Sequence, residues 1–204
     1  MKKLYFYCEG ETEFNYIMEL SRLLRESDCQ EIILIPKIVK ISAPSNYYKV
    51  IKKLINNLNG SFHSLYVWID YDIFKRKNIQ IEQIKKMLDE IVIPKKLKLD
   101  NRSLVLALNI MNGEDFLVLH CENNKINKWE KICKERDHFM NPMTRSEYYP
   151  LFKDNIISNY QKGEIPKGFV NLFTIKRAMD NNINKNISFE SGIFEALKII
   201  FKDG

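Results

Sequence analysis

The sequence predicts an α/β fold in which a mostly parallel four-stranded sheet is followed by a helical C-terminal extension. Short apolar runs alternate with segments whose apolar residues recur at helical spacing, and this alternation is typical of a parallel sheet covered by helices. The four expected strands are 4–8, 32–35, 65–69 and 104–108. Beyond residue 109 the pattern is helical, and the helices expected there are 114–121, 126–136, 150–160, 169–180 and 189–202.

Signals at the ends of these segments support their boundaries. A helix begins soon after the first strand, and its apolar residues are Phe14, Ile17, Leu20 and Leu24. We expect Pro36 to break or bulge the second strand, which then continues at Ile38-Val39. The clearest amphipathic helix spans 47–58 and stops at Asn59-Gly60. Pro94 ends the helix that precedes the fourth strand.

Composition narrows the class of protein. The chain has 204 residues, of which 45% are hydrophobic and 12% aromatic, which argues against a disordered chain. We expect an α/β core over 1–122 and a helical extension over 123–204 that packs on it. The sequence shows no run of about 20 apolar residues and no signal-peptide pattern, so we expect no membrane span and a cytoplasmic location.

The cysteines and histidines lack the spacing of metal ligands. The four cysteines show no C-x-x-C pair, so we expect buried thiols rather than a zinc site. His120 follows an apolar helical stretch, and we interpret it as a packing histidine rather than a catalyst.

Acidic residues follow the first and third strands where each strand ends. Glu9-Gly10 follows the first, and Asp70-Tyr-Asp72 follows the third. Ligands of α/β sheets bind at the carboxyl ends of the strands, and residues i and i+2 of an extended chain point the same way. Asp70 and Asp72 can therefore close on one Mg²⁺ or Mn²⁺ ion. The competing interpretation is a strand-end turn with helix-capping acids.

Four further residues are candidates for the same site. Glu9 is expected to act as a third ligand or as a general base. Glu13 is either a further metal ligand or a first-turn acid that faces the helix dipole. Glu114 is placed to position metal or water, but Asp115 offers the same electrostatics, so which of them faces the site stays open. Lys162 is expected to balance transition-state charge.

Three motifs together resemble a known family. Glu9-Gly10 followed by Asp-x-Asp resembles the Toprim domain of topoisomerases, primases and OLD-type nucleases. The segment Asn112-Gly-Glu-Asp-Phe-Leu-Val-Leu-His120 resembles the Glu-x-Trp/Phe-Leu-Leu-Leu-His motif of the RloB/AbiLii-like Toprim proteins of phage-defence loci. The opening Cys-Glu-Gly-x-Thr-Glu and Tyr160-Gln-Lys162 are similar to further elements of that family, so the matches span 4–166. Gly113 departs from the pattern because relatives carry an aromatic residue before the glutamate, and Phe116 stands in place of tryptophan.

The resemblance implies a Rossmann-like Toprim core and a Mg²⁺-dependent nuclease that acts in antiviral defence by abortive infection. It also implies a separate ATPase subunit from the same locus, and an acid/base and metal-contact role for Glu9. The predicted catalytic residues are Glu9, Asp70, Asp72, Glu114 and Lys162, and the predicted metal ligands are Glu9, Glu13, Asp70 and Asp72.

Positive charge near the acidic motif suggests a polyanionic partner. The chain has a formal net charge of +6, and Lys75-Arg76-Lys77 begins three residues after Asp72. We expect these three residues to contact phosphates of DNA or RNA, because phosphate contacts dominate nucleic-acid affinity. Lys85 and Lys86 are better explained as the solvated face of a helix.

Two alternative functions stay open. The chain could be a non-catalytic regulator whose pocket binds metal or nucleic acid, or a small Toprim ribonuclease that processes RNA. A haloacid-dehalogenase phosphatase is excluded because its Asp-x-Asp follows the first strand, whereas here the motif follows the third. The sequence also contains no G-x-x-x-x-G-K-[ST] phosphate loop, so nucleotide hydrolysis by that route is excluded. The sequence leaves the oligomeric state open.

Overall fold

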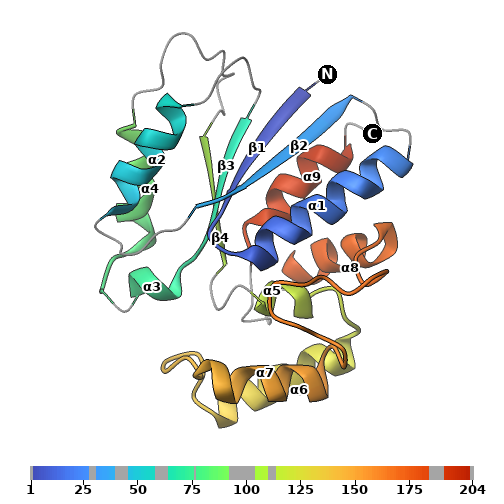
Figure 1. The fold of residues 1–204 in the computed structure, drawn as a ribbon. Coiled ribbons are helices and arrows are strands. Elements are labelled where there is room, and N and C mark those ends of the chain that lie inside the picture. The colour runs from blue at the N-terminus through green and yellow to red at the C-terminus, as the bar shows by residue number, and fades with distance from the viewer. Residues whose placement is uncertain are drawn as a thin grey trace.

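The computed structural model has an α/β fold in which helices cover both faces of a parallel sheet (Figure 1). The structure describes residues 2–27, 31–39, 46–57, 64–75, 77–91, 104–109, 114–183 and 191–202. The strands are β1 Lys2–Cys8, β2 Ile32–Ile38, β3 Ser64–Asp70 and β4 Leu104–Asn109. All three strand pairings are parallel, and the strand order is β2-β1-β3-β4. The predicted fold class is confirmed.

The helices fall into a group within the sheet unit and a group that follows it. Within the unit they are α1 Glu11–Glu26, α2 Tyr47–Asn56, α3 Asp72–Lys75 and α4 Ile81–Asp89. After β4 they are α5 Asp115–Val118, α6 Asn123–Glu135, α7 Arg145–Asn155, α8 Leu172–Ile183 and α9 Ile193–Lys202. Figure 1 shows α2 and α4 on one face of the sheet, α1 and α9 on the other, and α6 and α7 beyond the carboxyl ends of the strands.

The strand order creates a switch point between β1 and β3. From β1 the chain crosses to β2 on one side, whereas from β3 it crosses to β4 on the other side. The two connections diverge at the carboxyl ends of the two central strands. In doubly wound α/β proteins this is where ligands bind.

Side chains on alternate strand residues form two apolar cores. Leu4, Phe6 and Cys8 of β1 face the core that includes α1 and α9, whereas Tyr7 faces the core that includes α2 and α4. The first core also contains buried residues of α5, α6, α7 and α8, so residues on both sides of position 122 share it. No helix among the described residues is long and apolar enough to cross a membrane.

Aromatic rings form the centre of the first core. Tyr16, Trp68 and Phe116 contact one another edge-on, with ring centroids 4.8 to 5.7 Å apart. His120 is buried beside them, and its Nε2 lies 3.0 Å from the hydroxyl of Tyr16. Burial lowers the pKa of His120 to about 3, so the ring is neutral at physiological pH. The expectation of a packing histidine is confirmed.

Two predicted boundaries are wrong for identifiable reasons. β2 runs unbroken through Pro36, because β2 is an edge strand and an edge tolerates a residue without an amide hydrogen. α7 begins at Arg145 rather than at 150, because Thr144 and Glu147 form a reciprocal cap. In that cap the backbone amide and the hydroxyl of Thr144 donate to Oε2 of Glu147, at 3.0 and 2.7 Å.

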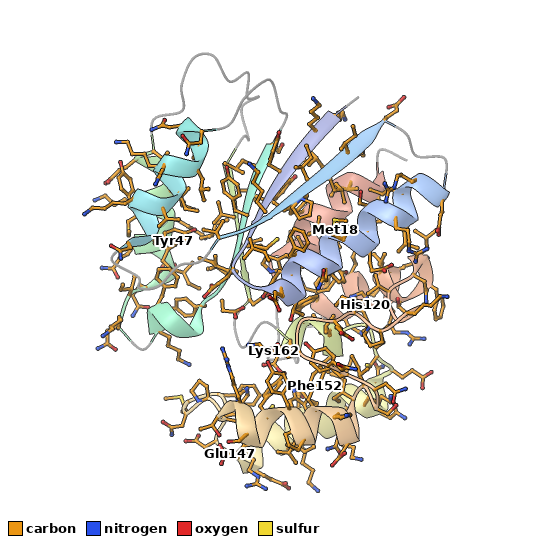
Figure 2. The ribbon with its side chains drawn as sticks, viewed as in Figure 1. Met18, Tyr47, His120, Glu147, Phe152 and Lys162 are labelled. Carbon is orange, nitrogen blue, oxygen red and sulfur yellow. The ribbon has the colours of Figure 1, made fainter. Side chains whose placement is uncertain are left out.

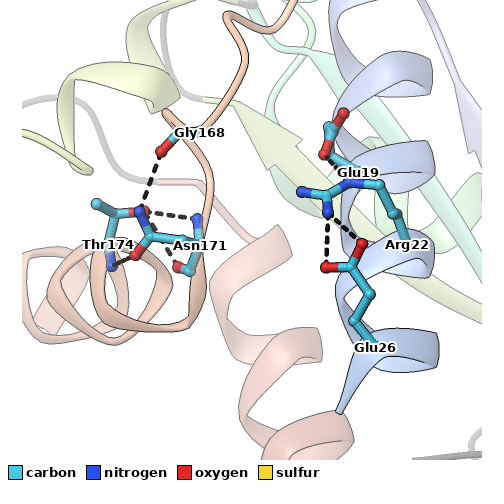
Figure 3. Close-up of polar contacts among 6 residues, drawn as sticks. All are labelled: Glu19, Arg22, Glu26, Gly168, Asn171 and Thr174. Carbon is cyan, nitrogen blue, oxygen red and sulfur yellow. Dashed lines mark hydrogen bonds and ion pairs between the residues drawn. The ribbon is translucent and has the colours of Figure 1, made fainter. Parts of the chain in front are cut away.

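Local polar contacts set the ends and the surface of two other helices (Figure 3). The amide of Thr174 donates to Oδ1 of Asn171 at 3.0 Å, and the amide of Asn171 donates to Oγ1 of Thr174 at 3.0 Å, so α8 begins at Leu172. On α1, Arg22 pairs with Glu19 and Glu26. Such exposed pairs contribute little to stability.

A buried carboxylate attaches the helical extension to the sheet. Asp115, which is 1% exposed, opens α5. Its Oδ1 accepts hydrogen bonds from Trp129 Nε1 of α6 at 2.9 Å and from the hydroxyl of Tyr148 of α7 at 2.7 Å. The amide of Met143 donates to Nδ1 of His138, so Nε2 carries the ring proton and donates to Oδ2 at 3.4 Å.

We expect Asp115→Ala to lower the free energy of unfolding by about 3 kcal/mol or more, because it leaves three buried donors without their acceptor. Urea denaturation measures this change. Asp154→Ala, which removes an exposed acid of α7, is the matched control and should change stability by less than about 0.5 kcal/mol. Equal losses in the two variants would show that the Asp115 network does not stabilise the extension.

Candidate functional site

Glu9 and Asp70 meet at the switch point of the sheet. The backbone amide of Glu9 donates to the carbonyl of Trp68 at 3.0 Å, and the amide of Asp70 donates to Oε2 of Glu9 at 2.9 Å. The ends of β1 and β3 are thus joined by a backbone hydrogen bond and by a carboxylate. Two residues that lie 61 positions apart in the sequence share one edge of the sheet as a result.

Asn109, the last residue of β4, connects the acids of two elements. Its Nδ2 donates to Oδ1 of Asp70 at 2.9 Å and to Oε1 of Glu13 at 3.4 Å. Its Oδ1 accepts from Trp68 Nε1 at 2.8 Å and from Ser191 Oγ at 2.6 Å. Two donors on Oδ1 fix the amide, so Nδ2 faces the carboxylates. Asn109 is absent from the predicted site residues, although it ends a strand at the same edge.

Glu13 is a buried acid in the first turn of α1, where it is 2% exposed. The pKa of Glu13 is raised to about 8, mainly by burial and to a smaller extent by the negative charges of Glu114 and Glu9. Gly10 makes room for this side chain, because a Cβ atom at position 10 would lie 2.9 Å from Oε2 of Glu13. The glycine after the first strand therefore allows Glu13 to turn toward the sheet edge.

Glu114 faces this site, whereas Asp115 faces the helical extension. Glu114 is 9% exposed, and its Oε1 accepts hydrogen bonds from the hydroxyls of Tyr149, Tyr160 and Thr12. Its charge reaches Glu13. Hydrogen-bond partners that lie far apart in the sequence therefore determine which of the two neighbouring acids faces the site.

The acidic residues suit a hard divalent cation. Glu9, Glu13, Asp70 and Glu114 are joined by hydrogen bonds or by electrostatic coupling, and oxygen donors of this type are the ligands that Mg²⁺ prefers. Among the described residues no lysine or arginine forms an ion pair with Glu13 or Glu114. Carboxylates gathered in this way repel one another, and a bound cation relieves that repulsion.

The described residues do not by themselves form a full set of metal ligands. The residues placed there contain no group of three or more Asp, Glu, His or Cys side chains that could hold a metal ion. The side chain of the predicted ligand Asp72 lies outside the described residues, although its backbone begins α3 directly after the switch point.

Two of the three predicted basic residues are described by the structure, on or just after α3, which follows the end of β3. Lys75 of α3 donates from Nζ to the carbonyl of Phe139, which follows α6, at 2.8 Å, and thereby links the sheet unit to the extension. Lys77 is exposed, and Arg76 lies outside the described residues.

Lys162 is exposed on the loop between α7 and α8. Gly163 follows Lys162, and its carbonyl accepts a hydrogen bond from Nδ2 of Asn15 in α1 at 2.5 Å. Gly163 has φ of +81°, which favours glycine, so the loop can turn here. Figure 2 shows Lys162 above α7, toward the carboxyl edge of the sheet.

Three hydroxyl residues join the site without having been predicted as part of it. Thr12 resembles a helix cap in the sequence, yet it lies buried inside the first turn of α1. Tyr160 is noticeable only because it stands two residues before Lys162 in a motif, and Tyr149 carries no sequence signal.

Comparison of the chain with protein-family models, curated proteins and solved structures yields no match.

The raised pKa of Glu13 predicts that stability falls as pH rises. A folded-state pKa of about 8, against 4.5 ordinarily, means that the folded chain holds a proton that the unfolded chain has released. In chelator, the free energy of unfolding should therefore decrease between pH 5 and 8 by up to about 1.4 kcal/mol per pH unit. The glutamine of Glu13→Gln does not titrate, so the stability of this variant relative to the wild type should increase as pH rises.

Urea denaturation at pH 5, 6, 7 and 8 measures this dependence. Glu11→Gln, an exposed acid of the same helical turn, is the control and should follow the wild-type profile. If the wild type and Glu13→Gln respond identically to pH, Glu13 does not hold a proton at neutral pH.

Proposed function

We propose that this chain is a Mg²⁺-dependent nuclease with a Toprim-type core, of the RloB-like group, and that it acts in the cytoplasm in antiviral defence. The observation that carries the proposal is the gathering of Glu9, Asp70, Asn109 and Glu13 at the switch point of a β2-β1-β3-β4 sheet. Hydrolysis of a phosphodiester requires charge neutralisation and an activated water molecule. A magnesium ion supplies both when it is bound.

The chain's own residues have distinct roles in this proposal. Asp70, Asp72 and Glu13 would hold the cation, with Glu9 as a further contact. Glu9 also suits proton transfer, because the backbone amide of Asp70 holds one of its carboxylate oxygens in place at the strand ends. Glu114 would orient water or the cation from the opposite side.

Cationic residues would recognise the phosphates. The run Lys75-Arg76-Lys77 begins three residues after Asp72, and Lys162 is exposed on the loop held against α1. Phosphate contacts by such residues supply affinity without sequence preference. The protein is therefore expected to recognise the shape of its DNA or RNA substrate rather than its sequence. An ATPase subunit of the same locus would control access to that substrate.

A second candidate is the non-catalytic regulator that binds metal or nucleic acid. Among the described residues no set of three ligands is already arranged around a point. A regulator would need the site to bind but not to cleave. Hydrolysis by the wild type separates this function from that of a nuclease.

We expect the wild type to bind Mg²⁺ or Mn²⁺ in calorimetry, and Asp70→Asn to weaken binding by at least about tenfold. The substitution removes the charge but keeps the oxygen that accepts from Asn109. Asp89→Asn, an exposed acid at the end of α4, is the control and should bind as the wild type does. Equal affinities of the wild type and Asp70→Asn would remove Asp70 from the metal site.

We expect Glu9→Gln to reduce metal-dependent cleavage of DNA or RNA by about 10²–10⁴-fold, the contribution of a general acid or base. Gln keeps an oxygen for the amide of Asp70, so the fold should be unaffected. Release of a fluorophore from labelled single- and double-stranded substrates measures the rate.

Glu82→Gln, which changes an exposed acid of α4, should keep full activity in the same assay. A wild type that binds the cation but cleaves neither DNA nor RNA would exclude the nuclease and support the regulator. Cleavage of RNA alone would support the small ribonuclease.

A further inference from the structure

Three hydroxyl groups converge on one oxygen of Glu114. Tyr149 donates to Oε1 at 2.9 Å, Tyr160 at 3.3 Å and Thr12 at 3.4 Å. The Thr12 and Tyr160 hydroxyls also lie 3.4 Å from each other. These donors come from α7, from the loop after α7 and from α1, so elements far apart in the sequence meet at a single atom.

The two phenols are held rigidly by their rings. Tyr149 and Tyr160 stack with centroids 6.2 Å apart and an interplanar angle of 22°. Tyr160 also packs edge-on against Phe152, at 5.1 Å. Because ring packing fixes the direction of each hydroxyl, the position of Oε1 is fixed before any ligand arrives.

The phenols stay protonated at neutral pH and can only donate to the carboxylate. Burial raises the pKa of both Tyr149 and Tyr160 above the ordinary value, and the negative charge of Glu114 raises each further. The charge of Asp70 adds to the effect on Tyr149. Tyr149 therefore lies within electrostatic reach of two of the acids that form the site.

The second oxygen of Glu114 has a different environment. Within the part of the chain that the structure describes, Oε2 accepts no hydrogen bond, although the residue is 9% exposed. One oxygen is thus held by three donors while the other is left for a ligand. Glu114 contacts Thr12, which directly precedes Glu13 in α1, so the carboxylate lies beside an acid that is expected to hold the cation.

We infer that Tyr149 and Tyr160 are positioning residues that hold Glu114 in place for the divalent cation. The inference rests on the proposed metal site, but it does not depend on nuclease activity. It makes the helical extension a part of the site, because Tyr149 and Tyr160 both lie beyond residue 122. Partners of metal-ligating carboxylates orient those ligands, and their loss weakens metal affinity by about 10–100-fold.

The neighbouring residue Tyr148 provides a matched control. Its hydroxyl donates to Oδ1 of Asp115 at 2.7 Å, which is the acid that faces the extension. Tyr148→Phe removes the same chemical group from the same turn of α7, and it also costs stability. It should leave the affinity for the cation unchanged.

The experiment measures Mn²⁺ binding by calorimetry for the wild type, Tyr149→Phe, the double variant Tyr149→Phe/Tyr160→Phe, and Tyr148→Phe. Circular dichroism well below the melting temperature establishes that each is folded. We expect the double variant to bind Mn²⁺ about 10–100-fold more weakly and Tyr149→Phe to show part of that loss. Where cleavage is measurable, kcat should fall while KM for nucleic acid is unchanged, since both hydroxyls donate to Glu114 and are expected to act through it.

Each outcome decides a separate question. Wild-type affinity in the folded double variant would overturn the positioning role and leave the proposed nuclease intact. If the double variant does not fold, wild-type affinity in Tyr149→Phe overturns the role instead. An equal loss in Tyr148→Phe would also overturn it, because the effect would then be one of general stability. A wild type that binds Mn²⁺ without cleaving nucleic acid would reject the nuclease alone, whereas a wild type that binds no Mn²⁺ would reject both.

Discussion

The hydrogen bonds to the buried carboxylate of Asp115 are the interactions on which the helical extension and the site depend. Three donors from α6, the following loop and α7 hold it. Such a group is costly to bury without partners and strongly directional with them. Because Glu114 precedes Asp115 in the chain, the bonds that fix Asp115 also fix the backbone from which Glu114 extends. The attachment of the extension and the geometry of the site are therefore set by two consecutive residues with opposite orientations.

The sheet supplies the second constraint, since its order brings three strand ends to one place. Glu9, Asp70 and Asn109 end or follow β1, β3 and β4, which are neighbours in the sheet. α1 starts at the same edge and contributes Glu13 and Thr12. The extension then covers this edge with tyrosine hydroxyls, so the site lies between a rigid sheet and a helical layer attached to it by buried polar bonds.

Much of the fold and the acids of the strand ends could be predicted from local pattern, whereas their partners could not. Apolar runs mark the strands because a covered parallel sheet buries both faces, and acids directly after such runs are conspicuous. The choice between Glu114 and Asp115 depends on tertiary contacts, so local sequence could not make it. Tyr149 reaches Glu114 across 35 residues and follows no periodic pattern. By contrast, the start of α7 could have been found from the spacing of Thr144 and Glu147.

The C-terminal segment covers the carboxyl end of β4, the outer strand of the sheet. Ser191 forms an antiparallel bridge with Asn109, and the amide of Gly192 donates to the carbonyl of Leu108 at 2.9 Å. A Cβ atom at Gly192 would lie 3.0 Å from the backbone of Ala107, so this approach requires glycine. An uncovered edge strand is a template for pairing with other chains. A chain shortened before Ser191 would expose the carboxyl end of β4 and would lose a donor that orients the Asn109 amide. The cover of this strand end and the geometry of the acidic site therefore depend on the same few residues.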